Sequence, residues 1–209
     1  MKTTNDDYLS TSNWYDRLLN PFLSHIRKSL VNWVVVNKPK RILDVGCGTG
    51  KQLSLLPNNI DAVGIDISDA MLAQANIQAA GKCKKGDAID IPFEDNEFDL
   101  VISQFALHEK DTDIINLELS EIRRILKPSG LFSVTDFDIP VKATLISKIF
   151  GSGIHQVEKH AGDEHYKNYL TWMNRGGLEK IMLNSGWKLV EDIPFYKGNV
   201  RLTFWSIQN

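Results

Sequence analysis

The strongest constraint on the fold of this chain is a stretch in which an apolar run breaks into three glycines at alternate positions. The stretch reads Arg41-Ile-Leu-Asp-Val-Gly-Cys-Gly-Thr-Gly50, and Lys51-Gln-Leu-Ser-Leu-Leu56 follows with helical character. A strand that enters a helix through a turn with few side chains lets a ligand contact the main chain directly. The stretch therefore predicts an α/β domain with a binding site at the turn.

Two classes of ligand use such a turn. A dinucleotide places its pyrophosphate on the helix N-terminus and requires the spacing Gly-x-Gly-x-x-Gly. Here the third glycine, Gly50, comes one residue early, and Lys51 stands where that pattern has glycine. Asp44 lies two residues before the first glycine, and its charge opposes a phosphate but favours a cation. The turn therefore favours S-adenosylmethionine, which carries an ammonium and a sulfonium.

Three successive predicted strands each end in a carboxylate: Asp44 after the first, Asp66 at the end of Asp61-Ala-Val-Gly-Ile-Asp66, and Asp87 after 82–86. Ligands of open α/β sheets bind at this edge, and an acid after the second strand receives ribose hydroxyls. Asp87 can accept from the adenine amino group. Both rival ligands contain the ribose, so Asp66 supports an adenosine site without choosing between them.

The rest of the chain continues the alternation of strands and helices. Ser68 is predicted to be the N-cap of a helix that ends at Gly81. Met71 in that helix is either a core residue or an adenine contact. Further strands are expected at 98–103, 131–136, 187–193 and 200–207, and further helices at 113–126 and 177–185. The predicted inward residues of the two helices 68–81 and 113–126 are Met71, Leu72, Ala75, Ile77, Ile114, Leu117, Ile122, Ile125 and Leu126. Such alternation predicts a parallel, doubly wound sheet.

Composition limits the classes of partner. A length of 209 residues fits about one domain, and a net charge of −2 gives no basic surface for nucleic acid. Two cysteines, Cys47 and Cys83, are not a disulfide framework and favour a reducing cytoplasm. The N-terminal residues lack the apolar core of a signal peptide. No apolar run approaches the ~20 residues that span a bilayer.

These motifs resemble the class I S-adenosylmethionine-dependent methyltransferases, and more narrowly the group that includes the ubiquinone and menaquinone C-methyltransferases. The matching segments are 42–50, 63–68, 86–88, 98–108 and 121–130, in the family's order and spacing. They are specific for the cofactor but not for the methyl acceptor. Trp14-Tyr-Asp-Arg-Leu18 resembles the opening helix of the quinone group more weakly.

The resemblance implies a Rossmann-like α/β sheet of seven strands, in the order 3-2-1-4-5-7-6, with the last strand antiparallel to its neighbours. It implies a single domain over 1–209. Its parts are an N-terminal helical cap (1–40), a cofactor-binding core (41–136) and a substrate lid (138–172). The cap carries an amphipathic pattern from Asn13 that Pro21 interrupts. It is either a helix packed on the sheet edge or a lid that places Trp14 and Tyr15 over the cofactor.

The resemblance also implies roles for single residues. The turn passes under the methionine part, whose ammonium goes to Asp44, while Asp66 holds the ribose and Asp87 the adenine amino group. Ile67 and Ala88 flank the ring, and Ser103 and Gln104 lie near the reacting methyl. The complete predicted cofactor site is Tyr15, Asp44, Gly46, Cys47, Gly48, Thr49, Gly50, Asp66, Ile67, Met71, Gly86, Asp87, Ala88, Ser103 and Gln104.

Residues 137–165 interrupt the pattern. A short apolar helix is expected at 141–150, followed by Gly151-Ser-Gly153 and by His155, His160 and His165. Steps of five residues turn a helix by roughly 140°, so the three imidazoles do not share a face. We therefore expect no metal site among them, but a mobile polar insertion.

Methyl transfer is an in-line displacement at a carbon that the sulfonium already activates. Proximity and alignment are the protein's main contribution, for which intramolecular models give roughly 7–11 kcal/mol. A general base is needed only if the acceptor must lose a proton. His108, just beyond the fourth strand, is the candidate for this catalytic role, and Glu109 is the alternative. His108 could equally pack against the following turn.

The expected acceptor is a small, partly apolar molecule, and the sequence leaves open whether its carbon, oxygen or nitrogen is methylated. No Asn/Asp-Pro-Pro-Tyr follows the fourth strand, so methylation of amino groups in DNA bases or glutamine is not supported. Two other functions remain as alternatives. One is a non-catalytic protein that binds the adenosyl ligand, and the other is a nicotinamide-dependent oxidoreductase on a similar fold.

Overall fold

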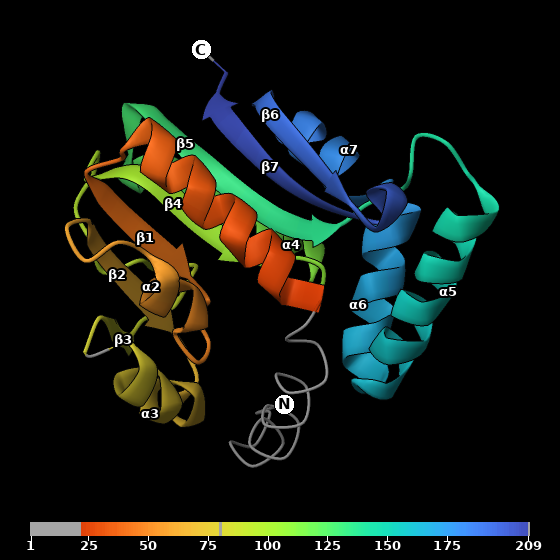
Figure 1. Cartoon of the computed structure of the whole chain (residues 1–209), viewed down its shortest axis with the longest axis horizontal. Coiled ribbons are helices and arrows are strands. Elements are labelled where there is room, and N and C mark those ends of the chain that lie inside the picture. The colour runs from red at the N-terminus through yellow and green to blue at the C-terminus, as the bar shows by residue number, and fades with distance from the viewer. Residues whose placement is uncertain (1–21, 80, 209) are drawn as a thin grey trace.

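The computed structural model describes residues 22–79 and 81–208, and its centre is a seven-stranded sheet (Figure 1). The strands follow the order β3-β2-β1-β4-β5-β7-β6, and β7 is antiparallel to both of its neighbours. The predicted topology is therefore confirmed. The strands are β1 (Arg41–Val45), β2 (Asp61–Asp66), β3 (Cys83–Lys85), β4 (Phe98–Gln104), β5 (Leu126–Phe137), β6 (Trp187–Phe195) and β7 (Val200–Ile207).

Helices pack around this sheet. They are α2 (Lys51–Leu55), α3 (Asp69–Gln78), α4 (Thr112–Ile125), α5 (Leu145–His160), α6 (Asp163–Asn174) and α7 (Gly177–Asn184), with a 3-10 turn η1 (Tyr196–Gly198). Residues 22–37 are also helical and cross the front of the sheet in Figure 1, while α7 lies behind β6 and β7. The pair α5 and α6 stands beyond the ends of β4 and β5, at the edge where the predicted site lies.

The central strands are buried because both faces of the sheet are covered. Every residue of β1 after Arg41 is buried, as are all residues of β4 except Asp99 and Gln104. Such continuous apolar runs are typical of parallel strands between two helical layers. The helix over residues 22–37 contributes the evenly spaced Ile26, Leu30 and Val34, none of which is more than 1% exposed. The described part of the predicted N-terminal helix therefore covers the sheet with one apolar face.

The buried face of α4 differs from the predicted one. Ile114 and Leu117 are 36% and 50% exposed, whereas Glu118 is fully buried. Lys110 donates a 2.5 Å hydrogen bond to the Glu118 carboxylate, and this pairing lets a charged residue take an inward position. The prediction for α3 is also wrong at two points. Ile77 is 85% exposed, and the helix ends at Gln78, so Gly81 lies in the turn that follows.

Helix α5 is the largest departure from expectation. A short helix ending at Phe150 and a mobile insertion were predicted, but α5 continues through Gly151-Ser-Gly153 to His160. A Cβ on Gly151 would lie 2.9 Å from the side-chain oxygen of Asn199, whose amide donates to the Ser147 carbonyl. Gly151 therefore allows Asn199 to approach the helix closely, and does not end it.

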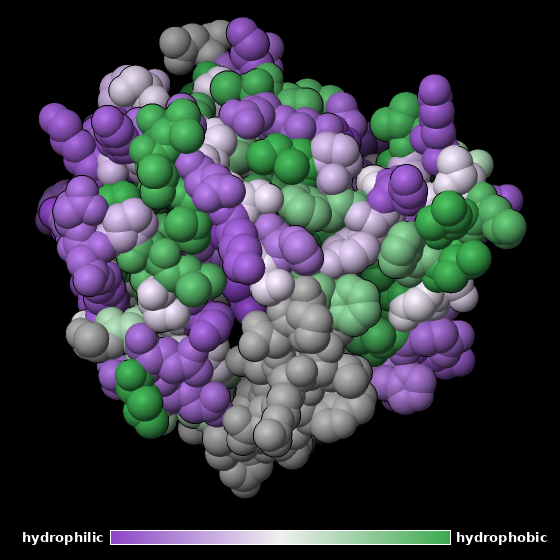
Figure 2. Space-filling view, in the orientation of Figure 1, coloured by the Kyte–Doolittle hydropathy of each residue, from purple (hydrophilic) through white to green (hydrophobic). Residues whose placement is uncertain are grey.

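The outer face of α5 and the loop before it carry exposed apolar side chains. Figure 2 shows apolar surface at the end of the molecule where Figure 1 places α5. The residues are Ile139, Val141, Leu145, Ile146 and Ile149, each at least 49% exposed. A contiguous apolar surface of this kind commonly marks a binding region. Within the described ranges, no helix combines the length and the apolar character needed to cross a bilayer.

Candidate functional site

The glycine turn between β1 and α2 is held by hydrogen bonds to β2. Gly46 and Cys47 both donate their amides to the Ile65 carbonyl, at 2.9 and 3.0 Å, and Gly48 donates to the Asp66 carboxylate at 2.8 Å. Gly46, Gly48 and Gly50 all have positive φ, between 52° and 71°, which other residues rarely adopt. The alternating glycines are therefore required by the backbone itself.

The three glycines differ in what surrounds them. A Cβ on Gly48 would meet nothing within 4 Å, whereas a Cβ on Gly50 would lie 3.0 Å from Ala79 and 3.2 Å from Cys83. Gly48 lines a cavity, while Gly50 packs against α3 and β3. Backbone at Gly48 is thus open to a ligand, and Gly50 has a packing role.

Beyond the turn lies a cavity of about 570 Å³, within the range of small-molecule sites. Its wall near β1 and α2 combines turn backbone with polar side chains: Asp44, Gly46, Cys47, Gly48, Thr49, Lys51, Gln52, Met71 and Gln104. Its other wall is mainly apolar and comes from the 22–37 helix, α5, η1, the residue after β4 and the ends of β5 and β7: Phe22, Leu23, Ile26, Phe105, Phe137, Ile149, Phe150, Ile154, Val157, Tyr196 and Val200. Arg27, Gly153 and Glu158 complete the lining. The cavity thus joins a polar half to an apolar half.

Asp44 is a buried carboxyl group in the polar half. It is only 3% exposed, and burial, with Cys83 and Asp66 nearby, raises its pKa from 3.8 to about 8, although Arg27 acts in the opposite direction. The protein groups around Asp44 therefore stabilise a negative charge on it poorly. A cationic ligand group beside Asp44 would supply the missing compensation.

Asp66, at the end of β2, accepts hydrogen bonds from the glycine turn and from the residue that precedes α3. Its Oδ2 accepts from Gly48 and its Oδ1 accepts from Ser68, each at 2.8 Å. The carboxylate is half-buried and close to the turn, although it is not among the described residues that line the cavity. Asp66 fixes the turn, and each oxygen keeps a further lone pair for a ligand hydroxyl.

The residues predicted for the adenine side lie along the same edge of the sheet. Met71 lines the cavity, while Ile67 is 66% exposed. Asp87 accepts from the Ile89 amide at 3.1 Å and is half-buried, as are Gly86 and Ala88. Apart from Met71, these residues lie outside the cavity lining formed by the described chain. Their contact with adenine stays a prediction.

At the end of β4 the two predicted neighbours differ. Gln104 lines the cavity and donates to the Gln52 side chain at 3.4 Å. Ser103 is fully buried in the sheet, and its hydroxyl has no hydrogen-bond partner within the described chain. The next residue, Phe105, lines the cavity with φ of 53°, an unusual value for a residue with a side chain. Tyr15, predicted over the cofactor, lies outside the described residues.

His108 has surroundings that oppose the predicted role as general base. It is 2% exposed, and its Nδ1 and Nε2 lie 2.7 Å from Asp136 and 3.3 Å from Glu158. Burial alone would lower the pKa of this imidazole, but the two carboxylates outweigh burial and raise the pKa to about 10. At neutral pH the ring therefore already carries the proton that a base would have to accept. The alternative, Glu109, accepts an Asn168 hydrogen bond through its carbonyl, and its carboxylate lies 3.5 Å from His165.

Several cavity residues were missed by the sequence reasoning. Arg27, Gln52, Phe105 and Glu158 all line it, and they come from three helices and one strand end. Only Gln52, in the helix directly after the glycine turn, has a position from which its place could have been predicted. The others reach the cavity through tertiary packing.

Comparison with known proteins adds to this geometry. Residues 43–134 match a family model described as "Methyltransferase domain". The chain is 35% identical over 136 residues to a demethylmenaquinone methyltransferase of Staphylococcus aureus, a match that covers 59% of this chain and 56% of the relative. The chain thus spans only 56% of that relative's length in the match.

Two solved structures share the fold. One is an S-adenosylmethionine-dependent methyltransferase from Thermotoga maritima, with a TM-score of 0.63 and 19% identity over 98% of this chain and 100% of that chain. The other, described by the same activity, is from Methanococcus maripaludis, with a TM-score of 0.63 and 19% identity over 100% of this chain and 96% of that chain. At such identities, these likenesses concern the fold.

Proposed function

We propose, on the premise that this chain belongs to the class I S-adenosylmethionine-dependent methyltransferases, that it transfers a methyl group from S-adenosylmethionine to a small, partly apolar acceptor. The observation that carries the proposal is the buried carboxyl of Asp44 beside the open backbone of Gly48. A buried carboxyl with a raised pKa, beside a turn whose amides already donate to Ile65 and Asp66, suits an ammonium group far better than a pyrophosphate. The ammonium of the methionine part would lie there.

The rest of the cofactor would follow the edge of the sheet. Ribose hydroxyls would donate to the free lone pairs of Asp66, whose carboxylate the Gly48 and Ser68 amides already orient. Adenine would lie toward Met71 and Asp87. In this placement the methyl group points away from β2, toward the half of the cavity lined by Phe105, Gln104 and the apolar wall.

The apolar half of the cavity supports an apolar or aromatic acceptor. Ile149 belongs both to this wall and to the exposed apolar surface of α5, so the surface is continuous with the cavity. The Staphylococcus aureus relative is named for a quinone precursor, an acceptor of this chemical kind. We propose that residues 138–172, which contain α5 and most of α6, act as the substrate lid.

The chain's contribution to the chemistry is alignment. Asp44, the turn and Asp66 would hold the cofactor, and the α5 wall would hold the acceptor in line with the sulfonium. His108 is placed to position Glu158 by an ion pair. His108→Gln tests the predicted base on an acceptor that must lose a proton. Turnover that keeps the wild-type pH profile in this variant would exclude the role.

Titration calorimetry with S-adenosylhomocysteine, and with NAD as the rival ligand, tests cofactor binding. The proposal requires binding of the first and not of the second. Incubation with S-adenosylmethionine and a panel of small phenols, quinols and amines then tests turnover, by measuring formation of S-adenosylhomocysteine. Tight binding with no product from any acceptor would favour the non-catalytic alternative, and preference for NAD would overturn the proposal.

A further inference from the structure

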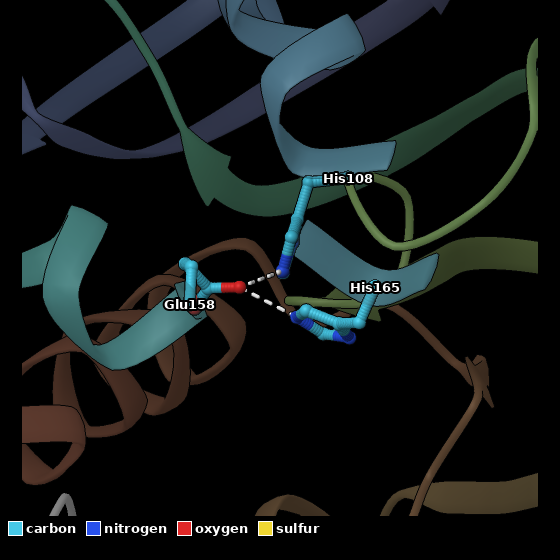
Figure 3. Close-up of side chains that lie close together, drawn as sticks. All are labelled: His108, Glu158 and His165. Carbon is cyan, nitrogen blue, oxygen red and sulfur yellow. Dashed lines mark hydrogen bonds and ion pairs between the residues drawn. The ribbon is translucent and has the colours of Figure 1, made fainter. Parts of the chain in front are cut away.

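A cluster of two histidines and a glutamate lies between the end of β4 and the helix pair α5 and α6. Glu158 lies near the end of α5, His165 in α6, and His108 in the segment after β4 (Figure 3). The ligand atoms of all three residues lie within 4.8 Å of one another. Glu158 also lines the cavity, so the cluster is part of its wall.

Both imidazoles approach the same carboxylate oxygen of Glu158. Oε2 of Glu158 lies 3.3 Å from Nε2 of His108 and 2.5 Å from Nε2 of His165, as the dashed lines in Figure 3 mark. A tetrahedral ion bound at about 2.1 Å holds its ligand atoms about 3.4 Å apart. The first separation already matches this value. The second requires the pair to open by about 1 Å, and His165, whose side chain is 22% exposed, has room to move.

Each imidazole presents its Nε2 to the cluster and its Nδ1 to a second carboxylate. Nδ1 of His108 lies 2.7 Å from Asp136, and Nδ1 of His165 lies 3.5 Å from Glu109. Histidines that bind metals almost always donate their other ring nitrogen to a carboxylate or carbonyl, which fixes the ring and makes the ligating nitrogen more basic. The contact of His108 with Asp136 has the length of such a hydrogen bond, and that of His165 with Glu109 is a longer ion-pair contact. Each of the two histidines beside Glu158 therefore has a second carboxylate behind it, as expected for metal-binding histidines and not for a single ion pair.

Two polar atoms of the cluster also lack hydrogen bonds. Nε2 of His108 and Oε1 of Glu158 are buried and have no hydrogen-bond partner among the described residues. Buried polar atoms are seldom left unpaired in folded proteins. The three carboxylates of Asp136, Glu158 and Glu109 also outnumber the two imidazoles. A bound cation would satisfy both the open valences and the charge.

We propose that His108, Glu158 and His165 form a binding site for a divalent transition metal ion, with Zn²⁺ the preferred occupant. Two imidazole nitrogens and one carboxylate oxygen are a ligand set of catalytic zinc sites, which leave one position open. Mg²⁺ and Ca²⁺ prefer sites made of oxygen atoms, so neither should compete. This proposal concerns a site separate from the adenosyl site and holds whatever the fate of the proposed methyl transfer.

The test measures metal binding to the full chain without any adenosyl ligand. Protein freed of metal with a chelator is dialysed against Zn²⁺ or Mg²⁺, and bound metal is counted by mass spectrometry. Co²⁺ is added separately to record its visible spectrum. We expect one Zn²⁺ per chain, no Mg²⁺, and Co²⁺ absorption bands typical of tetrahedral nitrogen and oxygen ligands. Added Zn²⁺ should also raise the unfolding temperature, because it binds the folded state.

Three variants identify the site. His165→Ala should lower Zn²⁺ affinity by at least about 100-fold, and Glu109→Gln by about 10-fold, as expected for a partner of a ligating histidine. His160→Ala is the control, because this exposed histidine contacts the Gln156 carbonyl and not the cluster. Urea unfolding checks that each variant folds, and Glu109→Gln, which keeps the size of a half-buried side chain, is the safer variant.

The result can go against the proposal in three ways. Wild-type protein that binds no Zn²⁺ would overturn it, as would equal binding of Mg²⁺. Zn²⁺ binding that survives in both His165→Ala and Glu109→Gln would place the ion elsewhere, for example on the buried thiols of Cys47 and Cys83. The cluster would then be only a network of hydrogen bonds and ion pairs between histidines and carboxylates.

Discussion

Replacing Asp44 with asparagine should make the protein more stable in the absence of added ligand, and should weaken its binding of the proposed cofactor. The carboxyl has a folded-state pKa of about 8 because it is buried near Cys83 and Asp66, whereas its ordinary value is 3.8. Between these two pH values the unfolded chain releases a proton that the folded chain keeps. The free energy of unfolding therefore falls as pH rises through this window. Asparagine keeps the shape of the side chain but does not titrate.

The size of the effect follows from the shift. Each pH unit inside the window lowers the free energy of unfolding by about 1.4 kcal/mol, so the loss reaches about 4 kcal/mol at pH 7. Between pH 5 and 7, well inside the window, the gap between variant and wild type should widen by about 2.6 kcal/mol. Comparing the two proteins at each pH cancels the other titrating groups, which they share.

Cofactor binding should change in the opposite direction. Loss of a charge-assisted hydrogen bond to the ammonium removes about 1.5–3 kcal/mol, which is about 10- to 100-fold in affinity. A residue with a purely structural role would not show this combination of higher stability and weaker binding. Higher stability of Asp44→Asn would mean that the wild-type protein keeps an unfavourable buried carboxyl because that group binds the ligand.

Urea unfolding at pH 5, 6, 7 and 8 measures the first effect, and calorimetry with S-adenosylhomocysteine measures the second. Asp61→Asn is the matched control. Its side chain is 62% exposed at the opposite end of β2, where it pairs with Arg41, so the change should be below about 1 kcal/mol. A constant gap between Asp44→Asn and wild type across the pH series would refute the raised pKa. Unchanged calorimetry would refute the ammonium contact.

Three further substitutions test other parts of the fold and site. Asp66→Ala should weaken S-adenosylhomocysteine binding by more than about tenfold, because it removes the ribose acceptor and frees the turn, yet the protein should still fold; equal calorimetric affinity would count against the ribose contact. Gly64→Ala places a Cβ 2.7 Å from Cys47 and should lower the free energy of unfolding in urea by about 1–3 kcal/mol. A variant as stable as wild type would show that the glycine turn shifts to make room for the added methyl group without a loss of stability. Arg201→Met leaves Asp138, 2.8 Å from the guanidinium, buried without its partner and should cost about 3–5 kcal/mol. A thermal unfolding temperature within a degree or two of wild type would contradict this ion pair's role.

The edge of the sheet that carries the glycine turn could be predicted because its signals are local. Glycines at alternate positions encode a backbone that other residues rarely adopt, and Gly46, Gly48 and Gly50 adopt it. Strand–helix alternation makes β1, β2 and β4 parallel, so their ends meet at one edge. Asp44 and Asp66 then follow without further information. The spacing of hydrophobic residues was a less reliable guide to which side chains are buried. Helix α4 buries Glu118 through an ion pair with Lys110 that the spacing does not reveal.

The chain beyond β5 could be predicted less well. The glycines at 151 and 153 suggest that a helix ends there. In the structure α5 continues through them, because Gly151 leaves room for the close approach of Asn199. Of the three histidines at 155, 160 and 165, the first hydrogen-bonds to Tyr166 and the second to the Gln156 carbonyl. What the sequence could not indicate was that His165 meets Glu158 and His108.

The amino-acid sequence by itself determined the sheet and its glycine turn, and it indicated the class of ligand that we propose for the turn. These depend on φ angles, strand order and charges within a few residues of one another. Tertiary structure alone decided which side chains form the apolar wall, why His108 is paired with two carboxylates, and where a metal ion could bind. Glu158 is 50 positions from His108, and only the packing of α5 and α6 against the end of β4 brings their side chains within 3.3 Å.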